Sequence, residues 1–317
     1  MDFSEILLNP HEIRLLRRHL KIPPKGHSII DDFRPSSLPV KIVSPYDHTY
    51  VFRVKKKESG VSILELMSTR FPFRSKEDWQ KRIRSGVIKV NDTTVDELKV
   101  IRVNDNISHR NIGVTEPSVP NDISVLRQGP GYLIVDKSAP IPMHAGGRYN
   151  RNTVVDILSE KGYGPLHIVH RLDAVTSGYL LLGRSPEFAR QFSRVMSDGG
   201  IRKTYEAIVS GVPSEDSITI DRGIKRDRGF LFKCSDDADS KKAITKFRVI
   251  HRGDGWSQIA CEPVTGRTHQ IRLHLAEWGY PIWDDYVYNK TMNKNEEHTK
   301  IQNRAISLVS MGLSHKE

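Results

Sequence analysis

The sequence predicts an α+β protein, with a larger domain built on a mixed, mainly antiparallel sheet with flanking helices and a small α/β module before it. From residue 122 onward, strand candidates outnumber helix candidates, and many have alternating or mixed polarity. Strands of an antiparallel sheet with one covered face show this pattern. The regular alternation of strands and helices expected of a doubly wound parallel sheet is not evident.

The chain divides into four segments. Residues 1–48 form an N-terminal extension, in which a short helix is expected at 11–20 and prolines then break any longer element. Residues 49–112 form the small module. Residues 113–121 contain Pro117 and Pro120 and are expected to be a linker. Residues 122–317 form the larger domain.

The small module has clear helix signals. Ser75 is expected to be an N-cap, with Asp78 three residues later near the first-turn amides, and Gly86 is a suitable residue to end that helix. The expected elements, in order, are a strand at 51–54, a helix at 61–67, a helix at 76–85, and strands at 87–90 and 100–108.

The larger domain has more strand signals than helix signals. Helices are expected at 186–197 and 268–278, each followed by glycine. Strands are expected at 132–136, 167–170, 179–182, 204–209, 218–220, 243–250, 257–262 and 306–313.

The charge balance favours a polyanionic partner. Forty-nine basic and 38 acidic residues give a formal net charge of +11, which suits RNA or DNA, although a merely basic protein also has such an excess. No apolar run is long enough for a membrane helix. Cys234 and Cys261 stand apart from each other and from clustered histidines, which argues against zinc and disulfides.

Targeting signals are weak. The N-terminus lacks a secretory signal, and its acidic residues Asp2, Glu5 and Glu12 are unusual for a mitochondrial transit peptide. We therefore expect a cytoplasmic protein, with mitochondrion and nucleus as the alternatives.

Two segments have patterns that indicate chemistry. Residues 170–178, His-Arg-Leu-Asp-Ala-Val-Thr-Ser-Gly, place charged groups between two apolar strands, which is costly unless the charges are paired. A turn capped by Asp173 and Ser177 is the simpler interpretation, but it does not explain Arg171. In residues 265–276, Arg272 lies one step from an apolar helix stripe and can reach into a pocket; an amphipathic helix with solvated basic residues is the alternative.

Together these two segments closely resemble the RluA-type pseudouridine synthases, over most of residues 124–289. The motif HRLD-x-x-TSG at 170–178 and the run TGRTHQIRLHLA at 265–276 are highly specific to that family. Residues 49–112 resemble the S-four-like RNA-binding module, on the pattern at 74–75, 84–91 and 103–107. The chain departs from the family pattern at Ser138, where proline is usual, and at residues 283–285, where the family prefers a Gly-Asp pair.

The resemblance implies an isomerase that converts specific uridines to pseudouridine in structured RNA, with tRNA favoured and rRNA or mRNA as alternatives. It implies Asp173 as the catalytic carboxylate, Arg272 as the guanidinium that keeps it ionised, and Tyr205 as the aromatic group against the base. Arg171 would fill the gap left by the extruded base. The reaction has no redox step, so no cofactor and no metal are expected. The expected RNA-binding residues are Arg171, His170, Arg267, His269, Lys203, Arg74, Lys81 and Arg84, and a monomer is favoured.

Three other functions fit the sequence less well. A non-catalytic RNA-binding relative is disfavoured because the acid, the aromatic residue and the arginine are all present. An additional deaminase unit needs H-x-E and P-C-x-x-C, and neither occurs. A DNA-binding or ribosome-assembly protein that uses mainly the small module would bind nucleic acid in a salt-sensitive way without isomerising it.

Overall fold

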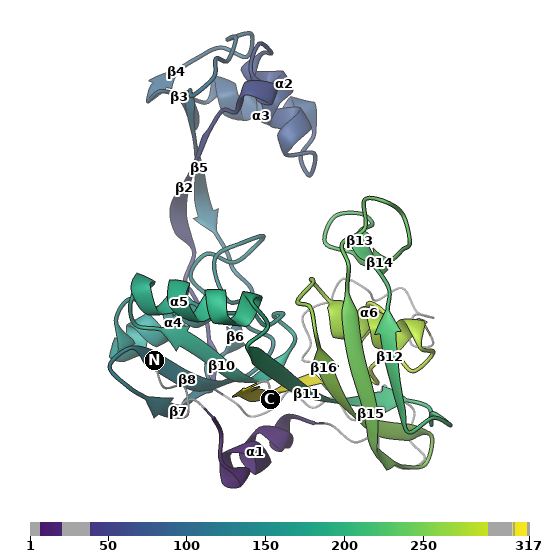
Figure 1. Cartoon of the computed structure of the whole chain (residues 1–317). Helices are drawn as coiled ribbons and strands as arrows, with labels where there is room; N and C mark the ends of the chain where they lie inside the picture. Colours follow the sequence, from purple (N-terminus) through teal and green to yellow (C-terminus); the bar gives the residue numbers. More distant parts are fainter. Residues whose placement is uncertain (1–6, 21–38, 291–305, 307, 316–317) are drawn as a thin grey trace. The chain divides into compact units, whose positions relative to one another are not determined.

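The computed structural model describes residues 7–20, 39–290, 306 and 308–315. Figure 1 shows its helices and strands. The chain divides into two compact units: Val43–Glu116, and Met1–Ile42 together with Pro117–Glu317. The expected module, 49–112, lies a few residues inside the first unit at each end. None of the described helices is both long enough and apolar enough to cross a membrane.

The smaller unit has a four-stranded antiparallel sheet in the order β2–β5–β3–β4. Ser75 caps α3 through a hydrogen bond from the backbone N–H of Asp78, and Gly86 after it has φ 72°, as the sequence predicts. Trp79 and Ile83 of α3 are buried against α2 and the sheet. The elements are β2 (Tyr46–Arg53), a 3₁₀ turn (Lys56–Glu58), α2 (Ile63–Arg70), α3 (Lys76–Arg84), β3 (Ile88–Val90), β4 (Thr93–Thr94) and β5 (Asn106–Val114).

The prediction of a strand at 100–108 is wrong about where the strand begins. The strand β5 begins only at Asn106, because the preceding residues form a turn. Asn104 has a left-handed φ of 70°, and the side chain of Asp105 accepts a hydrogen bond from the backbone N–H of Arg102. Asn and Asp favour such turns because their short side chains bond the local backbone.

The larger unit has a nine-stranded sheet in the order β12–β15–β16–β11–β17–β10–β8–β7, with β9 paired to β10. Only β10 and β17 run parallel, so the expected mixed, mainly antiparallel sheet is confirmed. Its strands are β7 (Ile123–Gln128), β8 (Tyr132–Lys137), β9 (His167–Ile168), β10 (Ser177–Gly183), β11 (Ile201–Ser210), β12 (Ser217–Asp221), β15 (Ile244–Arg252), β16 (Trp256–Pro263) and β17 (Leu308–His315). Two small pairs accompany it: β1 (Val40–Lys41) with β6 (Val119–Pro120), and β13 (Ile224–Arg226) with β14 (Phe232–Cys234).

The helices of the larger unit are few and short. They are α1 (Pro10–Leu16) with a 3₁₀ turn (Arg17–His19), α4 (Val154–Leu158) with a π turn (Ser159–Tyr163), α5 (Pro186–Ser197) and α6 (Gln270–Glu277). The expected helix at 268–278 begins two residues late, because His269 has a left-handed φ of 58°. Sequence reasoning missed α4 and β7.

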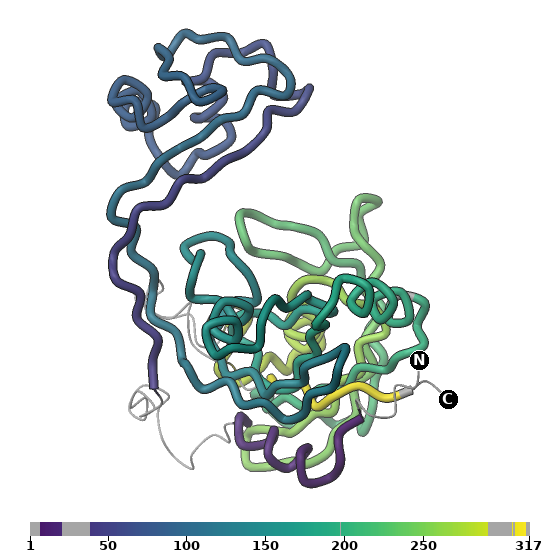
Figure 2. Tube along the Cα trace, turned by 90° about the vertical axis from the view of Figure 1, so that its left-hand side faces the viewer, coloured from purple at the N-terminus to yellow at the C-terminus, as the bar shows by residue number. Residues whose placement is uncertain are grey.

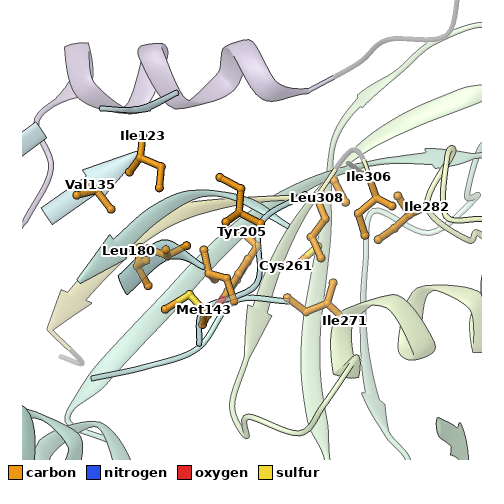
Figure 3. Packing of buried hydrophobic residues seen from close by; sticks show 14 of the residues in the cluster. Ile123, Val135, Met143, Leu180, Tyr205, Cys261, Ile271, Ile282, Ile306 and Leu308 are labelled. Carbon is orange, nitrogen blue, oxygen red and sulfur yellow. The ribbon is translucent and has the colours of Figure 1, made fainter. Parts of the chain in front are cut away.

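Two hydrophobic clusters cover opposite faces of the sheet, because side chains alternate along each strand. The first cluster contains Leu133, Leu180 and Tyr205, and Figure 3 shows Tyr205 among Leu180, Met143 and Leu308. The second contains neighbouring residues of the same strands, together with residues of α1 and α5. The first face is the one that carries the candidate site.

Candidate active site

The segment 169–176 connects β9 to β10 and carries Asp173, whose side chain is 23% accessible to solvent. Beneath it lies Lys137, the last residue of β8, which is fully buried. Its Nζ donates to the backbone carbonyls of Ser138, Ala174 and Thr176 at 3.2, 3.0 and 2.8 Å. Burial lowers the pKa of Lys137 to about 7, against the opposing effect of Asp173. The lysine therefore ties the Asp173 loop to the sheet.

Glycine at position 178 has a steric cause. Gly178 has φ 103°, and a Cβ there would collide with the backbone carbonyl of Ser310 on β17. The Gly at the end of the HRLD-x-x-TSG motif therefore lets β17 lie against the strand that follows Asp173.

Arg272 of α6 is almost fully buried and connects two carboxylates. Its Nε and Nη2 donate to Asp285 at 2.6 and 2.8 Å, and its Nη1 lies 3.4 Å from Oδ2 of Asp173. Its guanidinium also lies over the ring of Tyr288, 4.9 Å from the ring centre. Burial alone would lower the pKa of Arg272, but Asp285 and then Asp173 outweigh it and raise that pKa. The guanidinium is thus a fixed cation beside Asp173.

Tyr205 of β11 is buried and lines the same cavity as Asp173. Burial, and then the charge of Asp173, raise the pKa of its phenol, while a hydrogen bond with Ser310 opposes them. Tyr205 is therefore a neutral phenol with an aromatic face near the carboxylate.

His269 stands at the start of α6, 3.8 Å from Asp173 through Nε2 and 2.6 Å from the hydroxyl of Tyr288 through Nδ1. Burial lowers its pKa to about 4, opposed by Asp173 and aided by Arg272. The imidazole is therefore neutral near pH 7 and bonds polar groups without adding charge.

Two cavities meet at Asp173. One has a volume of about 310 Å³ and the other about 340 Å³, and both are lined by Arg171, Asp173, His269 and Arg272. Spaces of this size suit small organic groups such as a nucleotide. The first cavity also contains Lys203, and the second contains Phe230 of the β13–β14 turn.

The predicted RNA-binding residues of the larger unit gather at the first cavity, which His170, Arg171, Lys203, Arg267 and His269 all line. Arg171 and Arg267 are exposed. His170 has a further structural contact, because its Nε2 accepts the backbone N–H of Leu181 at 3.1 Å, and burial lowers its pKa to about 4.

The predicted RNA-binding residues of the smaller unit are described by themselves. Arg74 pairs with Asp78 at 2.8 Å and Arg84 with Glu97 at 2.6 Å, so a phosphate would compete with these carboxylates. Lys81 is exposed on the same helix, α3.

The chain is similar to known proteins along most of its length. Residues 131–277 match the family model of RNA pseudouridylate synthase. The chain is 34% identical over 279 residues to "RNA pseudouridine synthase 7" of Oryza sativa subsp. japonica, covering 85% of this chain and 71% of that protein. It belongs to the RNA pseudouridine synthase family.

Other family members are also similar. The yeast Saccharomyces cerevisiae protein named "tRNA pseudouridine(32) synthase, mitochondrial" is 29% identical over 86% of this chain and 58% of its own length. The chain spans 65% of the length of the Arabidopsis thaliana protein that is also named "RNA pseudouridine synthase 7". A structure titled "Human RNA Pseudouridylate Synthase Domain Containing 1" has the same fold, with a TM-score of 0.50 and 22% identity, over 60% of this chain and 77% of that one.

Sequence reasoning missed three residues of the site in this family member: Lys137, Asp285 and Tyr288. Asp285 lies in the segment at 283–285 that departs from the family pattern, yet it is buried and binds Arg272 through two hydrogen bonds. No local signal marks Asp285, because its neighbours in the sequence are Asp284 and Tyr286. Lys137 ends a buried strand, and a charge there that must find a partner was the available signal.

Proposed function

We propose that this protein isomerises uridine to pseudouridine within RNA, with Asp173 as the catalytic carboxylate. The observation that carries the proposal is the position of Asp173 at the meeting point of two cavities, 3.4 Å from the buried guanidinium of Arg272. The guanidinium supplies the opposite charge that a carboxylate in a partly dry site needs as a partner.

The reaction breaks the bond between C1′ of the ribose and N1 of uracil and forms a bond between C1′ and C5. The proton of C5 is lost and N1 ends protonated, so the net reaction is an isomerisation. Asp173 acts as nucleophile or stabilises positive charge as the glycosidic bond breaks, as carboxylates do in glycosidases. Tyr205 packs against the base and keeps its own proton, since the pKa of its phenol is raised.

The target uridine must leave its stack to reach Asp173. Arg171 is exposed beside both cavities, and its planar guanidinium can stack where the base has left. Lys203 and Arg267 on the first cavity then bind the neighbouring phosphates.

Transfer RNA is the proposed substrate class. The yeast relative carries a tRNA-directed name, and the net charge of +11 suits a folded polyanion. Ribosomal and messenger RNA are the alternatives. We further propose that the protein acts as a monomer in the cytoplasm. In this proposal residues 49–112, which lie within the compact unit Val43–Glu116, form an RNA-binding module that adds affinity.

Tritium release tests reaction and substrate together. RNA labelled at C5 of uridine loses tritium when C5 is joined to C1′, so small RNA and ribosomal RNA pools are incubated separately with the wild-type protein and with Asp173→Ala. The proposal expects release from the small RNA pool that disappears in the variant. Tight binding without release from either pool contradicts it and favours a non-catalytic RNA-binding protein.

A further inference from the structure

The N-terminal arm, residues 7–20, lies on the face of the sheet opposite the candidate site. Leu16 of α1 is fully buried in the second hydrophobic cluster, with Leu8, Ile13 and Leu20 packed around it. Figures 1 and 2 both show α1 in purple beside β17 in yellow. The arm is also fastened at its start, where Arg127 of β7 donates to Glu12 at 2.7 Å.

The arm binds two acidic residues that directly adjoin site residues. Arg17 donates to Glu206 through Nε at 2.9 Å and through Nη2 at 2.5 Å. Arg18 and His19 contact the carboxylate of Asp136 at 2.8 and 2.7 Å. Both acids are buried, with exposures of 7% for Glu206 and 1% for Asp136.

These acids alternate with site residues along their strands. Glu206 follows Tyr205 on β11, and Asp136 precedes Lys137 on β8. Because successive side chains point to opposite faces, each acid faces the arm while its neighbour faces the site. An ion pair on one face therefore fixes the backbone that presents the residue on the other.

The strand β17 lies between β11 and β10 in the sheet. It pairs with β11 from Ile201 to Ala207 and with β10 at Ser177 and Gly178. Its Val309 and Met311 face the arm in the second cluster, whereas Ser310 between them hydrogen-bonds Tyr205. The arm thus covers the back of the strand whose front holds the tyrosine.

We propose that residues 7–20 position the site from behind the sheet, with Arg17 as a positioning residue for Tyr205 and Arg18 for the Lys137-held loop that carries Asp173. This inference rests on the proposed isomerase function. The arm sets the rate of the chemical step and leaves RNA affinity unchanged, because it acts through the sheet.

The test uses the full-length chain with Arg17→Ala, Arg18→Ala and Arg17→Lys. Arg14→Ala is the matched control, since Arg14 is an exposed arginine of the same arm, on α1 just before the turn that holds Arg17 and Arg18. Single-turnover tritium release and the dissociation constant for the same RNA are measured, with thermal unfolding to show that each variant is folded.

Arg17→Ala is expected to slow the chemical step about ten-fold, because small displacements of reacting groups lower the rate steeply. The dissociation constant stays within about two-fold, since phosphate contacts set the affinity. Arg17→Lys recovers part of the rate, and Arg14→Ala matches wild type.

Two results overturn the inference. The first is an unchanged rate of the chemical step in both Arg17→Ala and Arg18→Ala. The second is weaker RNA binding by these variants with an unchanged chemical step, which would mean that the arm contacts RNA. A second readout does not depend on catalysis. Fluorotyrosine is incorporated, and the ¹⁹F resonance of Tyr205 is assigned with Tyr205→Phe. Arg17→Ala should move that resonance and Arg14→Ala should not. If Arg17→Ala leaves the resonance unmoved, the arm does not position Tyr205, even when wild type is active. If the resonance moves but wild type releases no tritium, only the isomerase function is refuted.

Discussion

At the residue scale, Asp285 controls where Arg272 holds its guanidinium. The two residues form a paired, buried contact at 2.6 and 2.8 Å, while the contact of Arg272 with Asp173 is longer, at 3.4 Å. Asp285 therefore sets the orientation of the arginine and leaves its third nitrogen for Asp173. Neither acid can be removed without changing the charge around the other.

Asp285→Asn is expected to lower the single-turnover rate by about 10²-fold, because the guanidinium loses its fixed position. The variant should also lose about 3 kcal/mol of unfolding free energy, since a buried charge is left partly unpaired. Both are measured against Asp254→Asn, an exposed aspartate in the turn after β15. A variant that keeps both the rate and the stability of wild type would show that Asp285 has no such role.

Stability should fall in mild acid, because burial lowers the pKa values of His170 and His269 from 6.5 to about 4. Between those values the unfolded chain binds protons on these histidines that the folded protein does not. The free energy of unfolding therefore rises with pH across this window and falls as pH drops toward 4. Urea unfolding across the window measures the slope, which His170→Gln should flatten. An equal slope in that variant would exclude His170 as a cause.

The sequence predicts some residues of the site and not others, because only some of them belong to local motifs. Asp173 and Arg272 lie in specific motifs, and the structure brings them into contact. Asp285 and Lys137 act through long-range pairing, and no local period marks a buried charge. Two of the backbone carbonyls that bind Lys137, those of Ala174 and Thr176, lie 37 and 39 residues further along the chain, so no local sequence window includes them together with the lysine.

At the element scale, alternation of polarity marks β12 and β16, because one face of these strands is more exposed than the other. The central strands β8 and β10 are buried on both faces, and their apolar runs predict them instead. The burial of β16 alternates at every residue, and this strand is placed within a residue of its expected ends. By contrast, β13 and β14 have three residues each, which is too short for a period to appear. The helix α4 has only five residues and was missed for the same reason.

Substitution of a basic residue on α3 tests whether the smaller unit binds RNA. Lys81→Ala is expected to weaken RNA binding similarly across RNA sequences and to reduce the slope of log affinity against log salt by about 0.7–1, the value of one phosphate contact. Lys246→Ala on β15 of the larger unit is the matched control, because Lys246 is also exposed. Equal slopes of log affinity against log salt for both variants would show that Lys81 does not contact RNA phosphate.

At the scale of the whole molecule, two units with separate hydrophobic clusters should unfold separately. Ile83→Ala removes a buried side chain of α3 and is expected to cost about 2–5 kcal/mol in the smaller unit. Calorimetry should show one transition moved to lower temperature and the other unchanged. If Ile83→Ala gives a single transition at a lower temperature than in wild type, the two units unfold together.

Conversion of uridine to pseudouridine through Asp173 is tested by nucleoside analysis of purified tRNA before and after incubation, because the two nucleosides have the same mass but separate by chromatography. With wild type, the pseudouridine gained should equal the uridine lost, while folded Asp173→Asn should bind the RNA and gain none. Equal pseudouridine from both proteins would rule out Asp173 as the catalytic carboxylate, and none from wild type on any RNA that it binds would rule out the isomerase function.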